Sequence, residues 1–427
     1  MKALKKIFFS TSLILFMFPG SCEEKTPAPD DQGDNGGLTL PAGFSAVVFA
    51  DKLGPGRHIA VGENGDVFLA LRSLKNGKGI VALRDANNDG KADSIVYFAD
   101  TPSTGIEIKG GYLYFSNFTE VYRVRMAQNR FTPAEVPVLI AGGFPAQSQH
   151  RDKTFTLDGA GNLYVNVGAP SNSCTQPDRT PGTPGLDPCP QLERHAGIWR
   201  FRADMPGQTQ VVQGHRYASG IRNSVALAWN YSNNKLYVVQ HGRDQLSQLY
   251  PGMYSDQEGA DLPAEEFFLV EDGDFFGWPY CYYDQIKKIK LLAPEYGGNK
   301  NATGRCADAK NPIMAFPGHL APNDLLFYTG NMFPERYRNG AFIAFHGSWN
   351  RAPLEQEGYY VVFVPFTNGL PSGDMEIFAD GFAGVDLVMG PGDAKYRPMG
   401  LAQGPDGSLY ISDSEIGRIW KVKYSAK

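Results

Sequence analysis

The sequence predicts an all-β protein, and its architecture is predicted to be a six-bladed β-propeller. A turn with Gly, Asp or Asn, followed by a short run rich in Val, Ile, Tyr and Phe, occurs six times. Such runs are typical of strands, and no long helical period separates them. The 49 glycines and 30 prolines among 427 residues suit a chain with many turns. A pair of β-sandwiches is the alternative architecture.

The six repeats are taken as the hairpins that join the innermost strand of each blade to its second strand. They read ENGDVFLALR (63–72), KGGYLYFSNF (109–118), GAGNLYVNVG (159–168), SNNKLYVVQH (232–241), RNGAFIAFHG (338–347) and GPDGSLYISD (404–413). Long loop insertions explain their uneven spacing.

The N-terminus predicts export. Residues 1–22 combine early lysines, a short apolar run over 7–18 and Pro-Gly-Ser-Cys, which is typical of a bacterial lipoprotein-type signal peptide. The run is too short for a transmembrane helix. Cys22 would carry the lipid, although Pro19 departs from the usual aliphatic residue and plain secretion is the alternative. Residues 23–38 are expected to be a disordered acidic, Pro- and Gly-rich tether, and 39–427 the propeller domain. The expected location is a bacterial membrane surface, periplasmic or extracellular, reached only through the lipid.

Four cysteines remain after Cys22, and an exported protein favours disulfides. The pairs nearest in sequence are Cys174 with Cys189 and Cys281 with Cys306, although three connectivities are possible. A zinc site competes, but no Cys-x-x-Cys spacing supports it. The net charge of -5 gives no reason to expect nucleic-acid binding.

Basic residues are predicted to gather at one end of the propeller. Residues before each innermost strand and after each second strand lie on one face, near the central channel. They include Arg57, Arg72, His150, Arg222, His241, His319, His346, Arg351 and Arg397, and Asn223 lies beside Arg222. Because like charges repel, this ring predicts an anionic ligand over the channel mouth. A solvated basic rim is the plainer interpretation.

Seven motifs occur in the order of a known family. They are GIRN (220–223), HGRDQL (241–246), FGWPYCYYD (276–284), HLAP (319–322), FHGSWNR (345–351), YRPMGLA (396–402) and GPDGSLYISD (404–413). With them, residues 40–422 resemble the pyrroloquinoline-quinone (PQQ)-dependent sugar dehydrogenases, in the L-sorbosone dehydrogenase-like or pyranose dehydrogenase-like branch. The family fold is the six-bladed propeller.

The resemblance implies PQQ and calcium as cofactors. PQQ is an ortho-quinone with three carboxylates, which would satisfy the basic ring. The implied PQQ-binding residues are Arg57, Arg222, Asn223, His346, Arg351, Lys395 and Arg397. Lys395 stands where the family has arginine, and it lacks the bidentate fork. The backbone carbonyls of Gly242 and Arg243 fall where the family binds calcium, and carbonyl oxygen is a suitable calcium ligand.

His150 resembles the catalytic histidine of the family. A neutral imidazole can take the hydroxyl proton of a sugar, and Arg222 would stabilise charge on the quinone oxygen. The aspartate that orients this histidine in the glucose branch is replaced here by Ala169. Asp152 or Asp244 is the candidate substitute, and His319 or His346 the alternative base.

A second calcium site is predicted in DANNDGKAD (85–93). Asp85, Asn87, Asp89 and Asp93 alternate around Gly90, as in the first part of an EF-hand loop. The twelfth position is Val96 instead of glutamate, so an Asx-rich turn is the alternative.

Two aromatic segments have open interpretations. Trp349 is either core or the apolar wall of a sugar subsite. FGWPYCYYD is expected to be a structural loop pinned by Cys281, and contact with substrate is the alternative.

The function expected is PQQ- and calcium-dependent oxidation of an aldose, pyranose or keto-aldehyde sugar, with electrons passed to an external acceptor. No Cys-x-x-Cys-His haem motif is present. Two alternatives remain: a non-catalytic sugar- or anion-binding propeller, and a metal-dependent propeller lactonase, which requires acidic calcium ligands in the channel.

Overall fold

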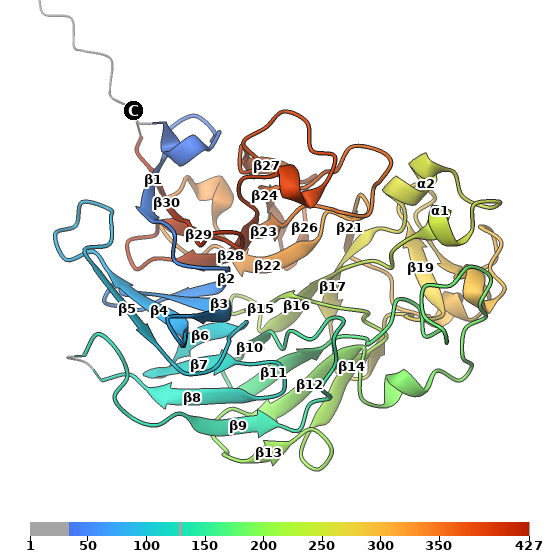
Figure 1. The fold of residues 1–427 in the computed structure, drawn as a ribbon, viewed down its shortest axis with the longest axis horizontal. Helices are drawn as coiled ribbons and strands as arrows, with labels where there is room; N and C mark the ends of the chain where they lie inside the picture. Colours follow the sequence, from blue (N-terminus) through green and yellow to red (C-terminus); the bar gives the residue numbers. More distant parts are fainter. Residues whose placement is uncertain (1–33, 128–129, 427) are drawn as a thin grey trace, which may run out of the picture. The chain divides into compact units, whose positions relative to one another are not determined.

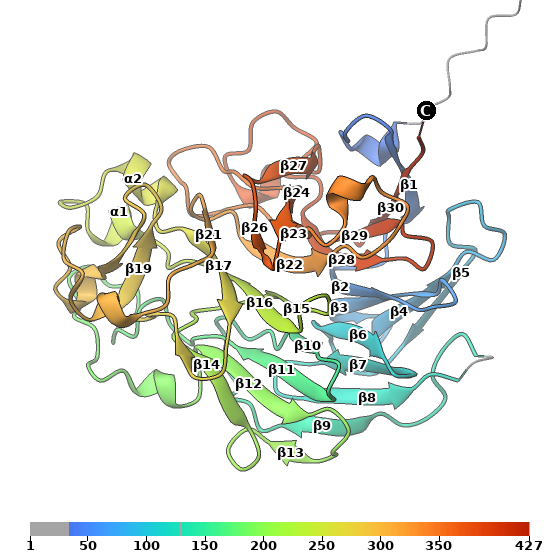
Figure 2. The same cartoon turned by 180° about the vertical axis from the view of Figure 1, so that it is seen from behind.

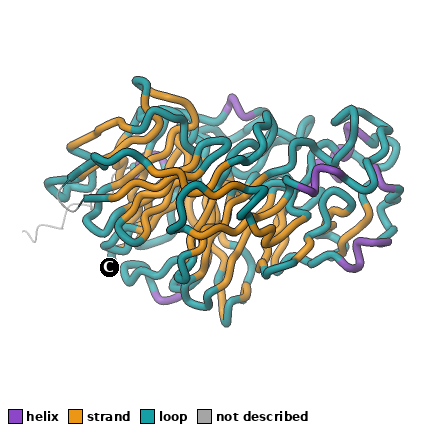
Figure 3. The backbone as a smooth tube through the Cα atoms, turned by 90° about the horizontal axis from the view of Figure 1, so that it is seen from below, coloured by secondary structure: helices purple, strands orange, loops and turns teal. Residues whose placement is uncertain are grey.

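The computed structural model describes residues 34–127 and 130–426, so the predicted signal peptide, Cys22 and most of the tether lie outside the described residues. Six sheets surround a central channel (Figures 1 and 2). Strands make up most of the regular structure, and helical turns are short (Figure 3). The predicted six-bladed propeller is confirmed.

Each blade begins with its innermost strand. In order from the channel, the first blade consists of β2 (Gly56–Val61), β3 (Val67–Lys75), β4 (Lys78–Arg84) and β5 (Ser94–Phe98). The second consists of β6 (Ile106–Lys109), β7 (Tyr112–Ser116), β8 (Val121–Arg125), β9 (Val138–Gly142) and the parallel β13 (Gln208–Thr209). The third consists of β10 (Phe155–Leu157), β11 (Asn162–Val167), β12 (Gly197–Arg202), β14 (His215–Ser219) and the parallel β18 (Asp274–Phe275).

The last three blades have four strands each. They are β15 (Ala226–Asn230), β16 (Lys235–Gln240), β17 (Glu265–Val270) and β21 (Met314–Phe316); β22 (Pro322–Phe327), β23 (Ala341–Phe345), β24 (Tyr360–Val364) and β27 (Glu376–Ala379); and β28 (Pro398–Gln403), β29 (Leu409–Asp413), β30 (Ile419–Tyr424) and β1 (Phe44–Ala50).

Small elements decorate the loops. They are the hairpins β19 (Cys281–Asp284) with β20 (Ile289–Leu292) and β25 (Phe366–Thr367) with β26 (Leu370–Pro371), the helices α1 (Leu246–Leu249) and α2 (Asp256–Asp261), and 3₁₀ turns at Asn35–Gly37, Pro190–Glu193, Pro294–Tyr296, Gly304–Asp308, Glu335–Tyr337 and Pro391–Asp393.

All six repeats found in the sequence lie at the connection between an innermost strand and its second strand. The fifth differs because 13 residues, 328–340, separate β22 from β23, and the repeat covers only the end of that connection. The turn chemistry therefore predicted the number of blades correctly.

The ring is closed by the N-terminal strand β1, which forms the outer edge of the sixth blade. It pairs antiparallel with β30, from Phe44 opposite Tyr424 to Ala50 opposite Ile419. Residues 34–37, part of the predicted tether, also reach this blade, since Nε1–H of Trp420 donates to the carbonyl of Gly36 at 3.1 Å. Chain segments from the two ends of the domain thus hold one sheet together.

Aromatic side chains fill the space beneath this closure. The ring of Phe44 lies 4.8 Å from that of Phe333 and 5.0 Å from that of Phe378, in both cases edge to face. Edge-to-face packing is the favoured arrangement of aromatic pairs, and it adds to the effect of burial. Phe44 is 5% exposed, so almost its whole ring is removed from water.

Both predicted disulfides are present. Cys174 is bonded to Cys189 and Cys281 to Cys306. The first closes a loop within the third blade, between β11 and β12, and the second pins the loop that carries β19 and β20. No helix among residues 34–127 and 130–426 is both long and apolar enough to span a membrane.

Replacing Phe44 by Ala is expected to lower the free energy of unfolding by about 3–5 kcal/mol, because it empties a buried aromatic site at the closure. Chemical denaturation followed by tryptophan fluorescence measures this. Ser45→Ala, a change on the partly exposed face of the same strand, is the control and should change it by less than about 0.5 kcal/mol. Equal effects of the two changes would show that the aromatic packing does not stabilise the closure.

Candidate active site

A cavity of about 570 Å³ lies at one end of the channel. Five of the six blades supply its wall, from residues at or just before the start of their innermost strands and from the ends of their second strands or the loops that follow. The lining residues are Arg57, Arg72, Ser148, Gln149, His150, Arg151, Asp152, Arg179, Arg222, Asn223, Val225, His241, Asp244, Ala321, Asn323, His346, Gly347, Trp349 and Arg397. Six arginines and three histidines thus face only two acidic side chains, and the predicted basic ring is present.

His150 is held by the backbone of Ala169. Its Nδ1 lies 2.6 Å from the Ala169 carbonyl oxygen, which can only accept, so Nδ1 carries the proton. In the neutral ring Nε2 is then a proton acceptor, and among the described residues the ring forms its hydrogen bond through Nδ1 alone. Neither Asp152 nor Asp244 replaces the missing aspartate, because Asp152 pairs with Arg57 and Asp244 with Arg222 and Arg179.

Close packing places His150 in this position. Its backbone φ is +49°, in the left-handed region that residues with a Cβ rarely occupy. Gly168 lies against it, and a Cβ there would come within 2.6 Å of the His150 Cβ and 2.8 Å of the Asn223 side-chain oxygen. Only glycine leaves room for the histidine here.

The environment keeps His150 neutral. Burial, followed by the positive charge of Arg222, lowers the pKa of His150 to about 3. The imidazole is therefore unprotonated, and able to accept a proton, throughout the ordinary pH range.

Arg222 is fixed from several sides. Its Nη2 donates to Asp244 at 2.7 Å and to the Asn172 side-chain oxygen at 3.1 Å, and its Nη1 donates to the Gly242 carbonyl at 2.8 Å. Burial raises the pKa of Asp244, but Arg222 and Arg179 outweigh it and hold this pKa well below its ordinary value. The pair is therefore ionised, and the guanidinium cannot move without losing charged hydrogen bonds.

Two buried polar atoms of the cavity wall have no hydrogen-bond partner within residues 34–127 and 130–426. They are Nε of Arg57 and the side-chain oxygen of Asn223. Arg57 pairs with Asp152 through Nη2, and its Nη1 donates to the sulfur of Met399 at 3.4 Å. Burial together with nearby arginines lowers the pKa of Arg57 to about 9. Unpaired buried polar groups are costly, and a polar ligand in the cavity would satisfy them.

Backbone carbonyls, instead of a carboxylate, hold Arg397 at the cavity. Its Nε donates to the carbonyl of His346 at 3.0 Å and its Nη2 to that of Gly347 at 2.7 Å, so no carboxylate neutralises it within the described residues. Burial lowers its pKa.

The histidines fall into two groups. His241 and His346 line the cavity, where Nε2 of His241 bonds to the Pro322 carbonyl at 2.8 Å and Nε2 of His346 to the Ser414 hydroxyl at 2.7 Å. His319 is buried elsewhere against the carbonyls of Gly259 and Leu262, and it is not a cavity residue. His58 lines the cavity of about 470 Å³ at the opposite end of the channel.

Two predicted PQQ-binding residues do not reach the cavity wall. Arg351 is buried, and it donates to the Ala260 carbonyl at 2.8 Å and to Glu357 at 2.9 Å. Lys395 is exposed, with Nζ 5.2 Å from the centre of the Tyr396 ring. In this structure Arg351 joins loops of the fourth and fifth blades.

The predicted calcium ligands are engaged differently. The Gly242 carbonyl oxygen already accepts from Arg222, and the Arg243 side chain forms a buried ion pair with Glu295 at 2.6 Å. A guanidinium on the same oxygen repels a second cation. These donors do not fit calcium as they stand. The calcium requirement stays a prediction.

The loop of residues 85–93 forms a network of Asx turns. Asp93 accepts from the backbone of Ala86 at 2.7 Å, and Asp85 accepts from that of Gly90 at 2.9 Å. Within the part of the chain that the structure describes, no group of three His, Cys, Asp or Glu side chains is arranged to hold a metal. Calcium binding by Asp85, Asn87, Asp89 and Asp93 therefore also stays a prediction.

The sequence did not single out Arg179 or Arg151. Arg179 lies in the Cys174–Cys189 loop and joins Asp244 at 2.7 Å, a contact that no local motif reveals. Trp349 lines the cavity and is 50% exposed, so it is not a core residue. Trp278 of FGWPYCYYD is buried and donates to the Asn172 carbonyl at 2.9 Å, as expected of a structural loop.

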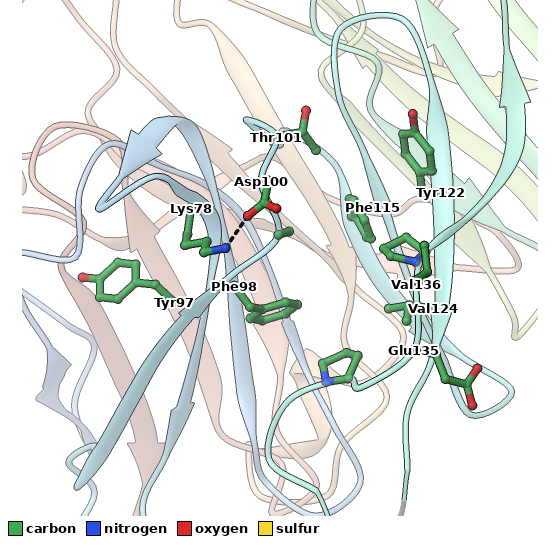
Figure 4. Close-up of a pocket in the computed structure, with 13 residues that line it drawn as sticks. Lys78, Tyr97, Phe98, Asp100, Thr101, Phe115, Tyr122, Val124, Glu135 and Val136 are labelled. Carbon is green, nitrogen blue, oxygen red and sulfur yellow. Dashed lines mark hydrogen bonds and ion pairs between the residues drawn. The ribbon is translucent and has the colours of Figure 1, made fainter.

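Another cavity, of about 580 Å³, lies between the first and second blades (Figure 4). Phe98, Phe115 and Tyr122 give it an aromatic wall, and Lys78 pairs with Asp100 at its edge. It contains no histidine or arginine, so it does not share the chemistry of the channel site.

Comparison with known proteins identifies the family. The model of the TrAA12-like family matches residues 38–425. A PQQ-dependent sugar dehydrogenase of Hypocrea jecorina is 25% identical over 97% of this chain and 96% of its own. A PQQ-dependent pyranose dehydrogenase of Coprinopsis cinerea is 28% identical over 48% of this chain and 30% of its own length.

Solved structures share the fold. The holo form of the PQQ domain of the Coprinopsis cinerea pyranose dehydrogenase gives a TM-score of 0.72 at 21% identity, covering 90% of this chain and 97% of that domain. The calcium structure of the Trichoderma reesei family AA12 enzyme gives 0.73 at 19% identity, covering 91% of this chain and 97% of that one. The chain therefore belongs to the TrAA12-like family, within the PQQ-dependent sugar dehydrogenases.

Proposed function

We propose that this protein oxidises a sugar with PQQ as its cofactor and passes the electrons to an external acceptor. The observation that carries the proposal is the neutral His150, with a free Nε2, in the same cavity as six arginines. Family membership supports it, because the relatives named above are PQQ-dependent dehydrogenases of sugars.

The cavity suits a tricarboxylate quinone. Arg57, Arg222 and Arg397 present buried or half-buried guanidinium groups, which bind carboxylates well because their donors are fixed in a plane. The free Nε of Arg57 and the unpaired Asn223 oxygen are the atoms that a polar ligand would satisfy. PQQ, when bound, supplies the quinone that takes up the hydride from the sugar.

His150 would act as the general base. Its Nδ1–H donates to Ala169, which fixes the tautomer and the ring plane, and Nε2 then accepts the proton of the substrate hydroxyl. The backbone N–H of Ala169 donates to the Arg222 carbonyl at 2.7 Å. Ala169 therefore forms hydrogen bonds both to the base, His150, and to the backbone of Arg222. Arg222 is the arginine that would stabilise negative charge during the reaction.

Trp349 would form the apolar wall for the sugar, because its exposed ring lies in the cavity next to Arg179, 5.9 Å from ring centre to guanidinium carbon. Lipid anchoring at Cys22 is a further part of this proposal. A calcium requirement is another, and calcium could bind only if Arg222 released the Gly242 carbonyl. Calcium is tested by adding it to, and chelating it from, the PQQ-loaded protein.

The geometry does not favour a lactonase. That chemistry needs acidic side chains free to hold calcium, whereas both aspartates of the cavity are paired with arginine. A non-catalytic propeller would bind PQQ without turnover.

His150→Ala is expected to leave PQQ binding intact and to slow sugar oxidation by roughly 10²–10⁴-fold, because only proton removal is lost. PQQ titration by fluorescence and dye reduction with a panel of aldoses measure the two effects separately. His215→Ala, at an exposed histidine on β14 outside the cavity, is the control. Failure of the wild type to bind PQQ would disprove the proposed function.

The acid limb of the kcat/KM profile is expected well below pH 6.5. Burial and Arg222 disfavour the imidazolium, which lowers the pKa of His150 to about 3, so the base stays active as the pH falls. Dye reduction between pH 4 and 8 tests this, with circular dichroism at each pH to confirm folding. An acid limb between pH 6 and 7 would point to a different, exposed base.

Gly168→Ala is expected to reduce turnover at least tenfold while the protein stays folded, because the new Cβ displaces His150. Gly159→Ala, in the β10–β11 turn of the same blade, has open space around it and should retain wild-type activity. Similar activity in both variants would show that the position of His150 does not limit the reaction.

A further inference from the structure

The cavity carries more positive charge than the proposed cofactor neutralises. Six arginines against two aspartates leave a formal surplus of four positive charges. The three carboxylates of PQQ reduce this surplus to one, and any bound calcium would raise it again. A site that binds only neutral sugars does not need this remaining positive charge.

Two of the six arginines have no partner of their own among the described residues. Arg57, Arg179, Arg222 and Arg397 are each held by a carboxylate or by backbone carbonyls. The side chains of Arg72 and Arg151 have no hydrogen bond or ion pair to any described residue, although both line the cavity and both are exposed.

No acidic side chain among the described residues pairs with Arg72 or Arg151. The guanidinium of Arg151 stacks on the ring of Phe118, 3.9 Å from its centre. Arg72 lies in β3, the second strand of the first blade. Its charge helps to lower the pKa of both Arg57 and Arg397. Two free cations therefore stand beside an already positive wall, where an added anion would be stabilised.

We propose that the substrate is an anionic sugar of the uronate type, whose carboxylate binds Arg72 and Arg151. This inference rests on the proposed function and narrows its substrate class. The ring C–H face would lie against Trp349, which is 50% exposed in the same cavity. The C1 hydroxyl would face His150.

The reaction balances without a further reagent. The C1 hydroxyl loses its proton to His150, and the C1–H bond breaks as a hydride leaves. The uronate loses two electrons and becomes the lactone. The hydride would go to the bound quinone, which would supply the two-electron oxidant, and the electrons would then reach the external acceptor. The proton held by His150 would leave to solvent. The carboxylate at C6 is unchanged, so it serves recognition alone.

The test compares sugars that differ only at C6. D-glucose is paired with D-glucuronate and D-galactose with D-galacturonate, and glucose 6-phosphate distinguishes a carboxylate site from a phosphate site. The kcat/KM of the PQQ-loaded protein is measured with one dye throughout, so that any preference of the acceptor cancels in the ratio. Calorimetric titration of glucuronate into protein loaded with reduced PQQ, which cannot accept a hydride, gives a readout that does not depend on turnover.

We expect wild-type protein to prefer the uronate over its neutral partner by about tenfold or more, and the ratio to fall with added salt. Arg72→Gln and Arg151→Gln should each lower the ratio by about three- to tenfold and weaken glucuronate binding, with an unchanged Kd for PQQ. Arg125→Gln removes the same charge from the exposed end of β8, and it should leave the ratio unchanged.

The other outcomes overturn the proposal in distinguishable ways. A uronate ratio near one in the wild type, with turnover of neutral sugars, would disprove the anionic substrate and leave the proposed function in place. A higher Kd for PQQ in Arg72→Gln and Arg151→Gln, with an unchanged ratio, would assign the surplus charge to the cofactor. Preference for glucose 6-phosphate alone would replace the carboxylate by a phosphate. Absence of both PQQ binding and turnover would overturn the proposed function together with this inference.

Discussion

Pairing of β1 with β30 is the constraint on which the rest of the structure depends. It joins the first strand of the domain to the last and completes the sixth blade. The innermost strands β2, β6, β10, β15, β22 and β28 then contact one another in a closed ring. Because these strands start at the same end of the channel, residues that are distant in sequence meet at its mouth.

Burying so many guanidinium groups at that mouth requires compensation. Asp244 supplies it for Arg222 and Arg179, and Asp152 supplies it for Arg57. A buried charge without a partner is costly, so these pairs keep the cations in the wall before any ligand arrives. The positive charge of Arg222 also disfavours protonation of His150. A group that would bind an anion therefore also helps to keep the base neutral.

The loops that decorate the propeller contribute to this arrangement. Asn172, just before the Cys174–Cys189 loop, accepts from Arg222 and donates to the Asp244 carbonyl at 2.9 Å. Its own carbonyl accepts from Trp278, in the loop pinned by Cys281. The two disulfide loops therefore support the back of the site, although they carry neither the base nor most of the cations.

The sequence by itself determined the repeats, and with them the six blades, the two disulfide pairs and the end of the disc where His and Arg gather. These features depend on local turn chemistry, on strand propensity and on short separations along the chain. Only the tertiary structure decided which basic residues face the cavity: Arg351 turns toward Glu357, whereas Arg179 reaches Asp244 from a distant loop. It also showed that the Ala169 carbonyl holds His150, a role that sequence cannot reveal because every residue has a backbone carbonyl.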